Sequence, residues 1–224
     1  LVGVYDGIYV IKRINGTWIL SHKIAGLNES CRWFAQESPQ SLWIANGNEV
    51  WQYYTNKELT RAKRIRVYNL RELIQVEKGT KLYNVNGKIV IATTKGIYEI
   101  NSKTKELELS KIIEKPKDYV TSLTQYNGSI ITLAPEHISL FNAKTGKETR
   151  NYFEIPSLPL VLDAETIIPI SDEQMIIPND NGFALFNSTG KSRSNTFYDM
   201  LHIKNVYQTY PKDSLLYTDN YLSI

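Results

Sequence analysis

The sequence is poor in several residue types, and each shortage argues against a class of protein. Cys31 is the only cysteine, which excludes an internal disulfide and leaves the redox compartment open. No apolar run approaches the roughly 20 residues that cross a bilayer. The net charge of +3 is small and gives no support for nucleic-acid binding, which needs a concentrated basic surface.

Both ends of the sequence have the character of β-strands. The first residues, Leu1-Val2-Gly3-Val4, lack an initiator Met and a visible signal peptide, and the last are Tyr221-Leu222-Ser223-Ile224. We therefore expect the chain to be a segment of a longer polypeptide, with targeting and membrane-spanning parts elsewhere.

What the sequence does contain is a repeated unit. In residues 86–101 the pair Asn86-Gly87 predicts a tight hairpin turn, because both residues readily take positive φ angles. An apolar strand, a polar turn and an alternating strand follow. Related units occur at residues 40–53, 127–142, 172–187 and 212–222, and residues 6–11 match the second half of a unit.

The spacing of these units indicates the architecture. The residues just before the second strand are Gly7, Glu49, Gly96, His137, Gly182 and Asn220, which lie 38 to 47 residues apart. This matches the period of about 40 to 50 residues of propeller blades built from four strands. The two-residue alternation and the frequent Gly, Asn, Asp and Pro favour strands over helical repeats, with one short helical turn expected within residues 67–77.

We therefore predict an all-β chain, a β-propeller of four-stranded blades. Residues 1–224 hold about five blades' worth of repeats and form a single propeller domain or a propeller fragment. The chain begins near the end of one blade and ends near the same point of a later blade. This arrangement suits closure of five blades by strand exchange, and it equally suits an arc of a larger ring. The strand-like ends favour a segment of a larger propeller.

Residues 41–45 and 88–100 resemble the two-component regulator propeller repeat, whose motif is an "LWIGT"-like strand, a Gly and a "GLYRYD"-like strand. Residues 65–70 resemble its passage between blades. The resemblance is weaker from Val120 onward, and His137 and Asn220 stand where a Gly is expected. In this family the propellers form the periplasmic sensor region of Bacteroidetes regulators, and they typically precede an Ig-like triple-tyrosine domain, a membrane span and a cytoplasmic output module.

Few residues are candidates for chemistry. His22, His137 and His202 fall in different blades without further donors nearby, so we expect structural roles and no metal or cofactor. Cys31 is expected to be a small buried residue. Propeller glycosidases carry paired carboxylates on the innermost strands. The segments predicted to be innermost contain no Asp or Glu, and they are residues 32–35, 81–84, 120–123, 166–169 and 205–208.

Two surface features have functional alternatives. The run from Arg61 to Arg66 alternates like an outer strand with a solvated polar side, or it contacts an acidic ligand or partner. Aromatic residues gather in the first third of the chain, at Trp18, Trp33, Trp43, Trp51, Tyr53 and Tyr54. Most are expected in the core between blades, and any one of them could instead meet a sugar ring.

Three functions follow from these observations. The first is a non-catalytic periplasmic sensor within an inner-membrane signal-transduction and transcription regulator. The resemblance suggests a small glycan as its ligand and allows a homodimer through the complete ectodomain, with membrane contact only through a span outside the sequence. The second is a scaffold for protein partners. The third is a propeller glycosidase or lyase, which the innermost strands disfavour.

Overall fold

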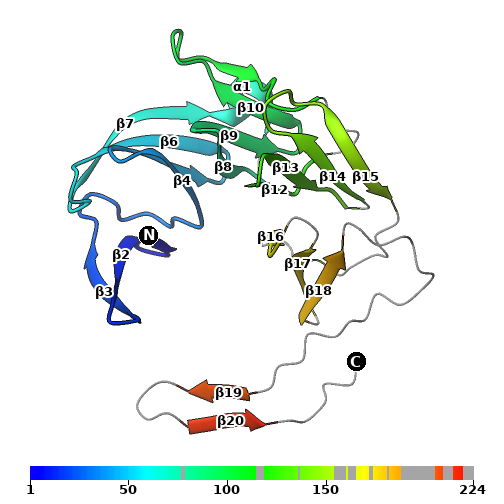
Figure 1. The fold of residues 1–224 in the computed structure, drawn as a ribbon. Coiled ribbons are helices and arrows are strands. Elements are labelled where there is room, and N and C mark those ends of the chain that lie inside the picture. The colour runs from blue at the N-terminus through cyan, green and yellow to red at the C-terminus, as the bar shows by residue number, and fades with distance from the viewer. Residues whose placement is uncertain are drawn as a thin grey trace. The chain divides into compact units, whose positions relative to one another are not determined.

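A computed structural model describes residues 1–76, 79–114, 119–135, 137–153, 160, 165–171, 174–180, 182–187, 205–208 and 214–218 (Figure 1). The chain divides into two compact units, Leu1–Ser157 and Leu158–Ile224. All sheet pairings in the described residues are antiparallel apart from one isolated bridge, and the predicted all-β propeller architecture is confirmed.

The first unit consists of four successive sheets, each built from strands in chain order. The first sheet has three strands, β1 (Val2–Val4), β2 (Gly7–Ile14) and β3 (Thr17–Lys23). The second has four, β4 (Trp33–Ser38), β5 (Ser41–Asn46), β6 (Glu49–Thr55) and β7 (Ala62–Asn69). The third has β8 (Lys81–Val85), β9 (Lys88–Thr93), β10 (Gly96–Ile100) and β11 (Leu107–Leu109). The fourth has β12 (Ser122–Tyr126), β13 (Ser129–Leu133), β14 (His137–Asn142) and β15 (Glu148–Phe153).

The second unit contains two smaller sheets among its described residues. One has three strands, β16 (Ile168–Pro169), β17 (Gln174–Asn179) and β18 (Gly182–Asn187). The other is the pair β19 (Asn205–Gln208) and β20 (Ser214–Thr218).

The predicted repeat coincides with the strands. The five aligned residues from Gly7 to Gly182 are the first residues of β2, β6, β10, β14 and β18, whereas Asn220 lies outside the described residues. Gly7, Gly96 and Gly182 have φ angles of 141°, 136° and 132°, which L-residues with a side chain rarely adopt. Glu49 and His137, at the same position of their blades, do not have a positive φ. The first residue of this strand can therefore have either backbone conformation.

The turn chemistry is also as predicted. Asn86 and Gly87 have φ angles of 52° and 77°, and Asn127 and Gly128 have 43° and 78°. Two successive positive φ angles define the tight hairpin turn whose twist matches that of the strands it joins. The turn fixes the register of the hairpin, so Val85 lies opposite Lys88.

The first sheet corresponds to the later part of a blade. Val4 pairs with Gly7 across the β1–β2 hairpin as Asn46 pairs with Glu49 across β5–β6. Strand β1 is therefore the counterpart of β5, and no described strand in this sheet corresponds to β4. The prediction that residues 6–11 belong to the second half of a repeat unit is confirmed.

The sheets of the first unit stack face to face, with β4 against β8 and β8 against β12. Strand β5 shows why its sequence is continuously apolar: Leu42 and Ile44 pack toward the first sheet, and Trp43 and Ala45 pack toward the third. Strand β9 repeats this arrangement, with Ile89 and Ile91 on one side and Val90 on the other. Middle strands buried on both faces lose the alternation that one-sided burial would impose.

The helical turn expected within residues 67–77 is also present as α1 (Leu70–Ile74). The Asn69 side chain caps it by accepting hydrogen bonds from the backbone N–H groups of Arg71 and Glu72. Leu70 is fully buried, so this turn anchors the passage from β7 to β8.

Candidate functional site

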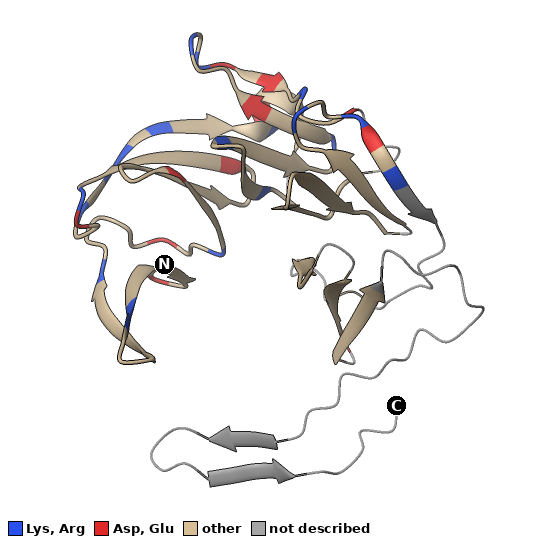
Figure 2. Ribbon diagram, viewed as in Figure 1, with Lys and Arg blue, Asp and Glu red and all other residues tan. Residues whose placement is uncertain are grey.

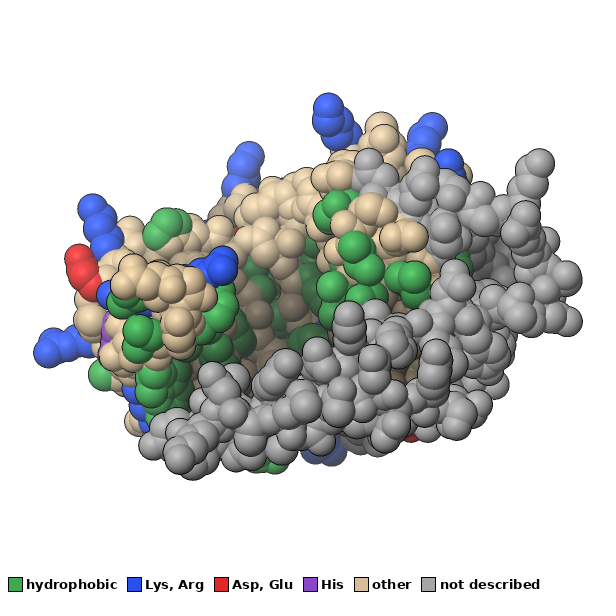
Figure 3. Space-filling view, turned by 60° about the horizontal axis from the view of Figure 1, so that its bottom comes forward, with side chains coloured by type: hydrophobic (Ala, Val, Ile, Leu, Met, Phe, Trp, Pro, Cys, Tyr) green, Lys and Arg blue, Asp and Glu red, His purple; other side chains and the backbone are tan. Residues whose placement is uncertain are grey.

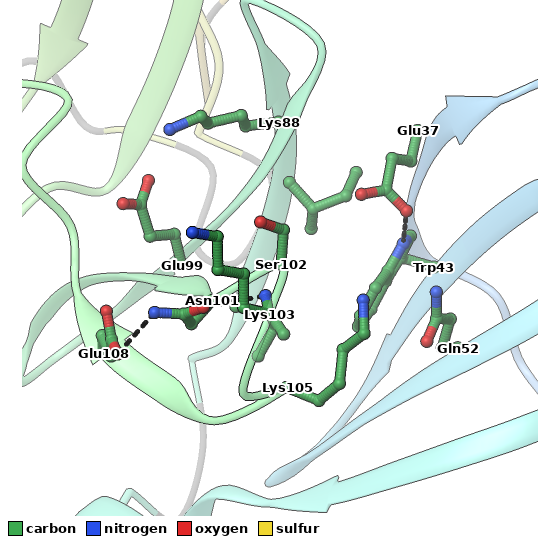
Figure 4. Close-up of a pocket in the computed structure, with 12 residues that line it drawn as sticks. Glu37, Trp43, Gln52, Lys88, Glu99, Asn101, Ser102, Lys103, Lys105 and Glu108 are labelled. Atoms are coloured by element: carbon green, nitrogen blue, oxygen red, sulfur yellow. Dashed lines mark hydrogen bonds between the residues drawn. The ribbon is translucent and has the colours of Figure 1, made fainter.

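A polar cleft of about 430 Å³ lies between the second and third sheets (Figure 4). One wall comes from β4, β5 and β6, and the other from β9, β10, β11 and the β10–β11 turn. The lining residues are Glu37, Trp43, Gln52, Lys88, Ile89, Glu99, Ile100, Asn101, Ser102, Lys103, Lys105 and Glu108.

Glu37 is the most firmly held carboxylate of the cleft. Its Oε2 accepts hydrogen bonds from Trp43 Nε1 at 2.9 Å and from Ser41 Oγ at 2.8 Å. Ser41 Oγ in turn accepts a 3.4 Å bond from Gln52 Nε2. No described residue bonds Oε1 of Glu37, so one carboxylate oxygen is oriented by the protein and available to a ligand.

The indole that holds Glu37 is itself fixed in the core. Trp43 is only 2% exposed and stacks on the ring of Tyr68, with centroids 5.9 Å apart and ring planes 25° apart. Burial raises the pKa of Tyr68, so its hydroxyl stays protonated at neutral pH. That hydroxyl donates to the Lys105 carbonyl oxygen at 3.1 Å and thereby ties the second sheet to the opposite wall.

The β10–β11 turn is shaped by Asn101. Its Oδ1 accepts from the backbone N–H groups of Lys103 and Thr104, at 2.9 and 3.1 Å, and its Nδ2 donates to Glu108 Oε1 at 2.8 Å. These bonds place Lys103 and Lys105 at the cleft, and Lys105 points toward Trp43 in Figure 4. Lys105 has a φ of 63°, in the left-handed region.

The charges of the cleft are equal in number and are not paired with one another. Each of its three carboxylates is bonded by a neutral donor: Glu37 by Trp43 and Ser41, Glu99 by Ser110, and Glu108 by Asn101. No ion pair joins these carboxylates to Lys88, Lys103 or Lys105, and the ion pairs that join two described residues are Lys23–Asp6 and Arg64–Glu29. Both signs of charge are interspersed over the first unit in Figure 2.

Glu37 corrects the prediction that the innermost strands carry no acidic residue. Strand β4 runs on past residue 35 to Ser38 and so includes Glu37, whereas β8 and β12 contain no Asp or Glu. The signal for the longer strand is Pro39, because proline marks a turn and so the end of the preceding strand. The other predicted innermost segments coincide with or overlap β8, β12, β16 and β19.

The histidines and the cysteine occupy structural positions where the structure describes them. His22 lies within hydrogen-bonding distance of Ser21 Oγ at 2.9 Å and of the Leu59 carbonyl oxygen at 3.1 Å, and His137 is buried. His202 lies outside the described residues. No group of three metal-ligating side chains occurs in the part of the chain that the structure describes. Cys31 is fully buried, and burial raises its thiol pKa to about 11.

The basic run from Arg61 to Arg66 lies at and just before the start of β7, the outermost strand of its sheet, as predicted. Arg64 lies 3.8 Å from Glu29 and stacks over the Trp51 ring, 5.1 Å from its centroid. The polar side is solvated, and the apolar residues between the basic ones are also about half exposed, Ile65 and Val67 among them. A register shift in the pairing of β6 with β7 at this point interrupts the alternation.

The aromatic residues divide into two groups. Trp43, Trp51 and Tyr53 are buried in the cores between sheets, as expected for most of the set. Trp33 is half-buried, and Trp18 and Tyr54 are 64% and 51% exposed. Hydrophobic side chains also reach the surface in Figure 3. Trp18 is one of several exposed apolar residues on β2 and β3, together with Ile14, Ile19 and Leu20.

No protein-family model matches the sequence, and no curated protein matches it. Among solved structures, the extracellular domain of a one-component system from B. thetaiotaomicron is similar over 84% of this chain and 25% of that chain, with a TM-score of 0.54 and 14% identity. The WD40 β-propeller domain of Doa1 is similar over 79% and 57%, with a TM-score of 0.52 and 15% identity. The AfRom2 CNH domain is similar over 79% and 55%, with a TM-score of 0.51 and 10% identity.

At these identities the likeness concerns the fold alone. The chain spans about a quarter to little more than half of each of these three structures. No helix within the described residues is long and apolar enough to cross a membrane. The chain is thus a β-propeller, and its function is a separate question.

Proposed function

We propose that this propeller is a non-catalytic, periplasmic ligand-sensing region of a membrane-bound signal-transduction and transcription regulator. The observation that carries the proposal is the cleft between the second and third sheets, where an oriented carboxylate faces a turn bearing two lysines. The resemblance of β5, β9 and β10 to the regulator propeller repeat supports it. The shared fold with an extracellular domain of a one-component system is consistent with it.

The cleft suits a ligand rich in hydroxyl groups. Glu37 Oε1 is available as an acceptor, and Gln52 and Ser102 add side chains that can both donate and accept. A small carbohydrate presents many such groups, and we propose a glycan as the ligand. Because Trp43 is almost wholly buried, its ring face is not available for stacking on a sugar.

Signalling follows from the position of the cleft between two blades. A ligand that bonds both Glu37 on β4 and the β10–β11 turn contacts two sheets at once. It shifts the equilibrium toward the blade spacing that it binds better, to the extent of its differential affinity for the two arrangements. In a homodimeric receptor this shift would bias the geometry of the pair.

A hydrolase or lyase has less support. Acid and base catalysis of glycoside cleavage uses two carboxylates on opposite sides of the bond. Propeller glycosidases carry that pair on the innermost strands, and of the described innermost strands β4, β8 and β12 only β4 carries a carboxylate, Glu37. The other carboxylates of the cleft, Glu99 and Glu108, belong to β10 and β11.

The test is a thermal-shift screen of the intact protein against cellotetraose, xylotetraose, arabinotetraose and trigalacturonic acid. We expect at least one of them to raise the melting temperature with increasing concentration, since binding to the native state alone stabilises it. Glu37→Ala and Gln52→Ala should abolish the shift, and the exposed control Lys57→Ala should keep it. A panel without any shift, or a shift that both cleft variants retain, would overturn the proposal.

A protein-interaction scaffold is the second candidate, favoured by the exposed apolar side chains of Trp18 and Leu20, which lie two residues apart on β3 and so on one face of it. Trp18 and Leu20 are 64% and 61% exposed, and such groups often mark protein contacts. Under this alternative, Trp18→Ala should reduce capture of a partner protein by the intact receptor, while the glycan screen stays negative.

A further inference from the structure

We infer that the cleft between the second and third sheets selects an acidic oligosaccharide, one whose sugar rings carry carboxylate or sulfate groups. The inference rests on the proposed function and specifies its ligand. Lysine ammonium groups would take the negative charge, and Glu37 and Gln52 would take the ring hydroxyls.

The lysines of the cleft are left without carboxylate partners. The carboxylates of the cleft could have neutralised them, yet each carboxylate is bonded by an indole, amide or hydroxyl donor instead. No hydrogen bond or ion pair to a described residue involves the side-chain nitrogen of Lys88, Lys103 or Lys105. Three ammonium groups therefore face the cleft without a carboxylate partner. Because three carboxylates line it as well, an anion would be bound through the positions of these lysines and not through a net positive charge.

The turn that carries Lys105 has a counterpart in the next sheet that carries a glycine at the same position. The turn at 101–106 and the turn at 142–147 of the next sheet have the same hydrogen bonds. In each turn the side chain of the leading Asn, Asn101 or Asn142, accepts from the backbone N–H groups two and three residues later. The backbone carbonyl of the same Asn accepts from the N–H group four residues later. The residue that donates this last bond is Lys105 in one turn and Gly146 in the other, with φ angles of 63° and 70°. The third sheet thus places a lysine side chain beside the cleft at a turn position whose backbone favours glycine.

The cleft offers no stacking surface among its lining residues. Many sugar sites rely on an aromatic ring face, but the aromatic residue lining this cleft, Trp43, is 2% exposed and packs on Tyr68. Recognition here depends on charge and hydrogen bonds. Such a site distinguishes an acidic sugar from a neutral one more sharply than a stacking platform would.

The experiment compares trigalacturonic acid with its neutral methyl ester, and a sulfated chondroitin disaccharide with its unsulfated form, by calorimetry on the intact protein. We expect at least one acidic probe to bind about tenfold more tightly than its matched partner at low salt, and the difference to shrink as salt screens the charges. The carboxylate and sulfate pairs show which anion is preferred.

Variants locate the effect. Lys105→Gly removes one charge at a position where glycine fits the backbone, so the fold is preserved, and melting temperature checks this. It should weaken binding of the acidic probe about fivefold to tenfold and leave neutral sugars unaffected, whereas Lys57→Ala should change neither. A double variant with Lys103→Ala should weaken the acidic probe further.

The outcomes separate the two proposals. Equal affinity for the charged and neutral probes, lost in Glu37→Ala, would overturn the charge selectivity and leave the sensor cleft standing. Undiminished binding of the acidic probe to Lys105→Gly with Lys103→Ala would likewise overturn it. Failure of every probe, charged or neutral, to bind would overturn both.

Discussion

Lys105 and Gly146 occupy the same position of two matching turns in successive sheets, and both have a left-handed backbone, with φ angles of 63° and 70°. In each turn the residue's N–H donates to the carbonyl of the leading Asn, at 2.9 Å for Asn101 and 2.8 Å for Asn142. A residue with a side chain costs about 1–2 kcal/mol in this conformation relative to the ordinary one. Lys105 is therefore strained where Gly146 is not.

Lys105→Gly should leave stability unchanged or raise it by up to about 1 kcal/mol. Relief of the left-handed conformation offsets the extra chain entropy that glycine adds to the unfolded state, about 0.5–1 kcal/mol. The matched control is Lys103→Gly in the same turn, where φ is not positive. That control should lower the free energy of unfolding in urea by about 0.5–1 kcal/mol. Equal losses in both variants would contradict the assignment of strain.

Gly26→Ala should be strongly destabilising. Gly26 has a φ of 89°, and a Cβ there would lie 2.2 Å from the carbonyl oxygen of Ala62, at the parallel bridge where Ala25 meets Arg61. We expect a loss of about 3 kcal/mol or more in urea unfolding, because backbone strain adds to a clash with backbone.

Gly16→Ala is the matched control for Gly26→Ala. Gly16 has a similar φ of 84°, but no atom lies within 4 Å of the position that an alanine methyl group would take. Its cost should be about 1 kcal/mol, the conformational part alone. Similar losses at both glycines would show that the approach to Ala62 is not rigid.

Trp43→Phe should weaken ligand binding in the cleft while keeping the fold. The substitution removes the N–H that holds Glu37 Oε2 and retains most of the stacking on Tyr68. Trp51→Phe is the control, because Trp51 Nε1 donates in the same way to Glu49, at 2.7 Å, outside the cleft. Both should lose about 1–2 kcal/mol of stability, and only Trp43→Phe should lose affinity in the calorimetric assay. A loss of affinity in both would point to a general loosening of the second sheet.

Cys31 should resist thiol reagents in the folded protein. It is fully buried, and burial raises its pKa to about 11, so very little thiolate is present at pH 8. We expect labelling by a disulfide reagent to proceed only at the rate of unfolding, and to become rapid in urea. Fast labelling of the native protein would show that the core between the first two sheets opens readily.

The same thiol predicts a pH dependence of stability. Its folded pKa lies above the ordinary value of 9.0, so the native state holds the proton more tightly than the unfolded state. The corresponding stability is complete below pH 9 and is lost as the pH rises from about 9 to about 11. Cys31→Ala should flatten this part of the profile in urea unfolding. A profile that is the same in both proteins would contradict it.

The strand starts, the hairpin turn and the short helix were predictable from the sequence, because each depends on residues close together in the chain. The starts of β2, β6, β10, β14 and β18 were located by their spacing, and the turn at Asn86-Gly87 by its residue types. Both depend on local backbone preferences, which the sequence displays directly. The short helix at Leu70–Ile74 was predicted for the same reason.

The candidate site was not predicted, because its residues come together only through register and packing. Glu37 and Gln52 belong to separate strands of one sheet, and the β10–β11 turn belongs to the next. The matching Asn101 and Asn142 turns are visible in the sequence as Asn-Ser-Lys-Thr-Lys and Asn-Ala-Lys-Thr-Gly. The register shift at Ile65 was not predicted, since a shift in an edge strand leaves no clear mark in composition.

Three hydrophobic clusters of described residues in the first unit each join one sheet to the next. One cluster joins the first and second sheets, another the second and third, and a third the third and fourth. The folding energy of such a unit resembles that of a one-dimensional array, in which each element is coupled to its nearest neighbours. Ligand occupancy of the cleft should therefore protect amides of the second and third sheets most strongly in hydrogen exchange, with protection fading one sheet at a time along the chain.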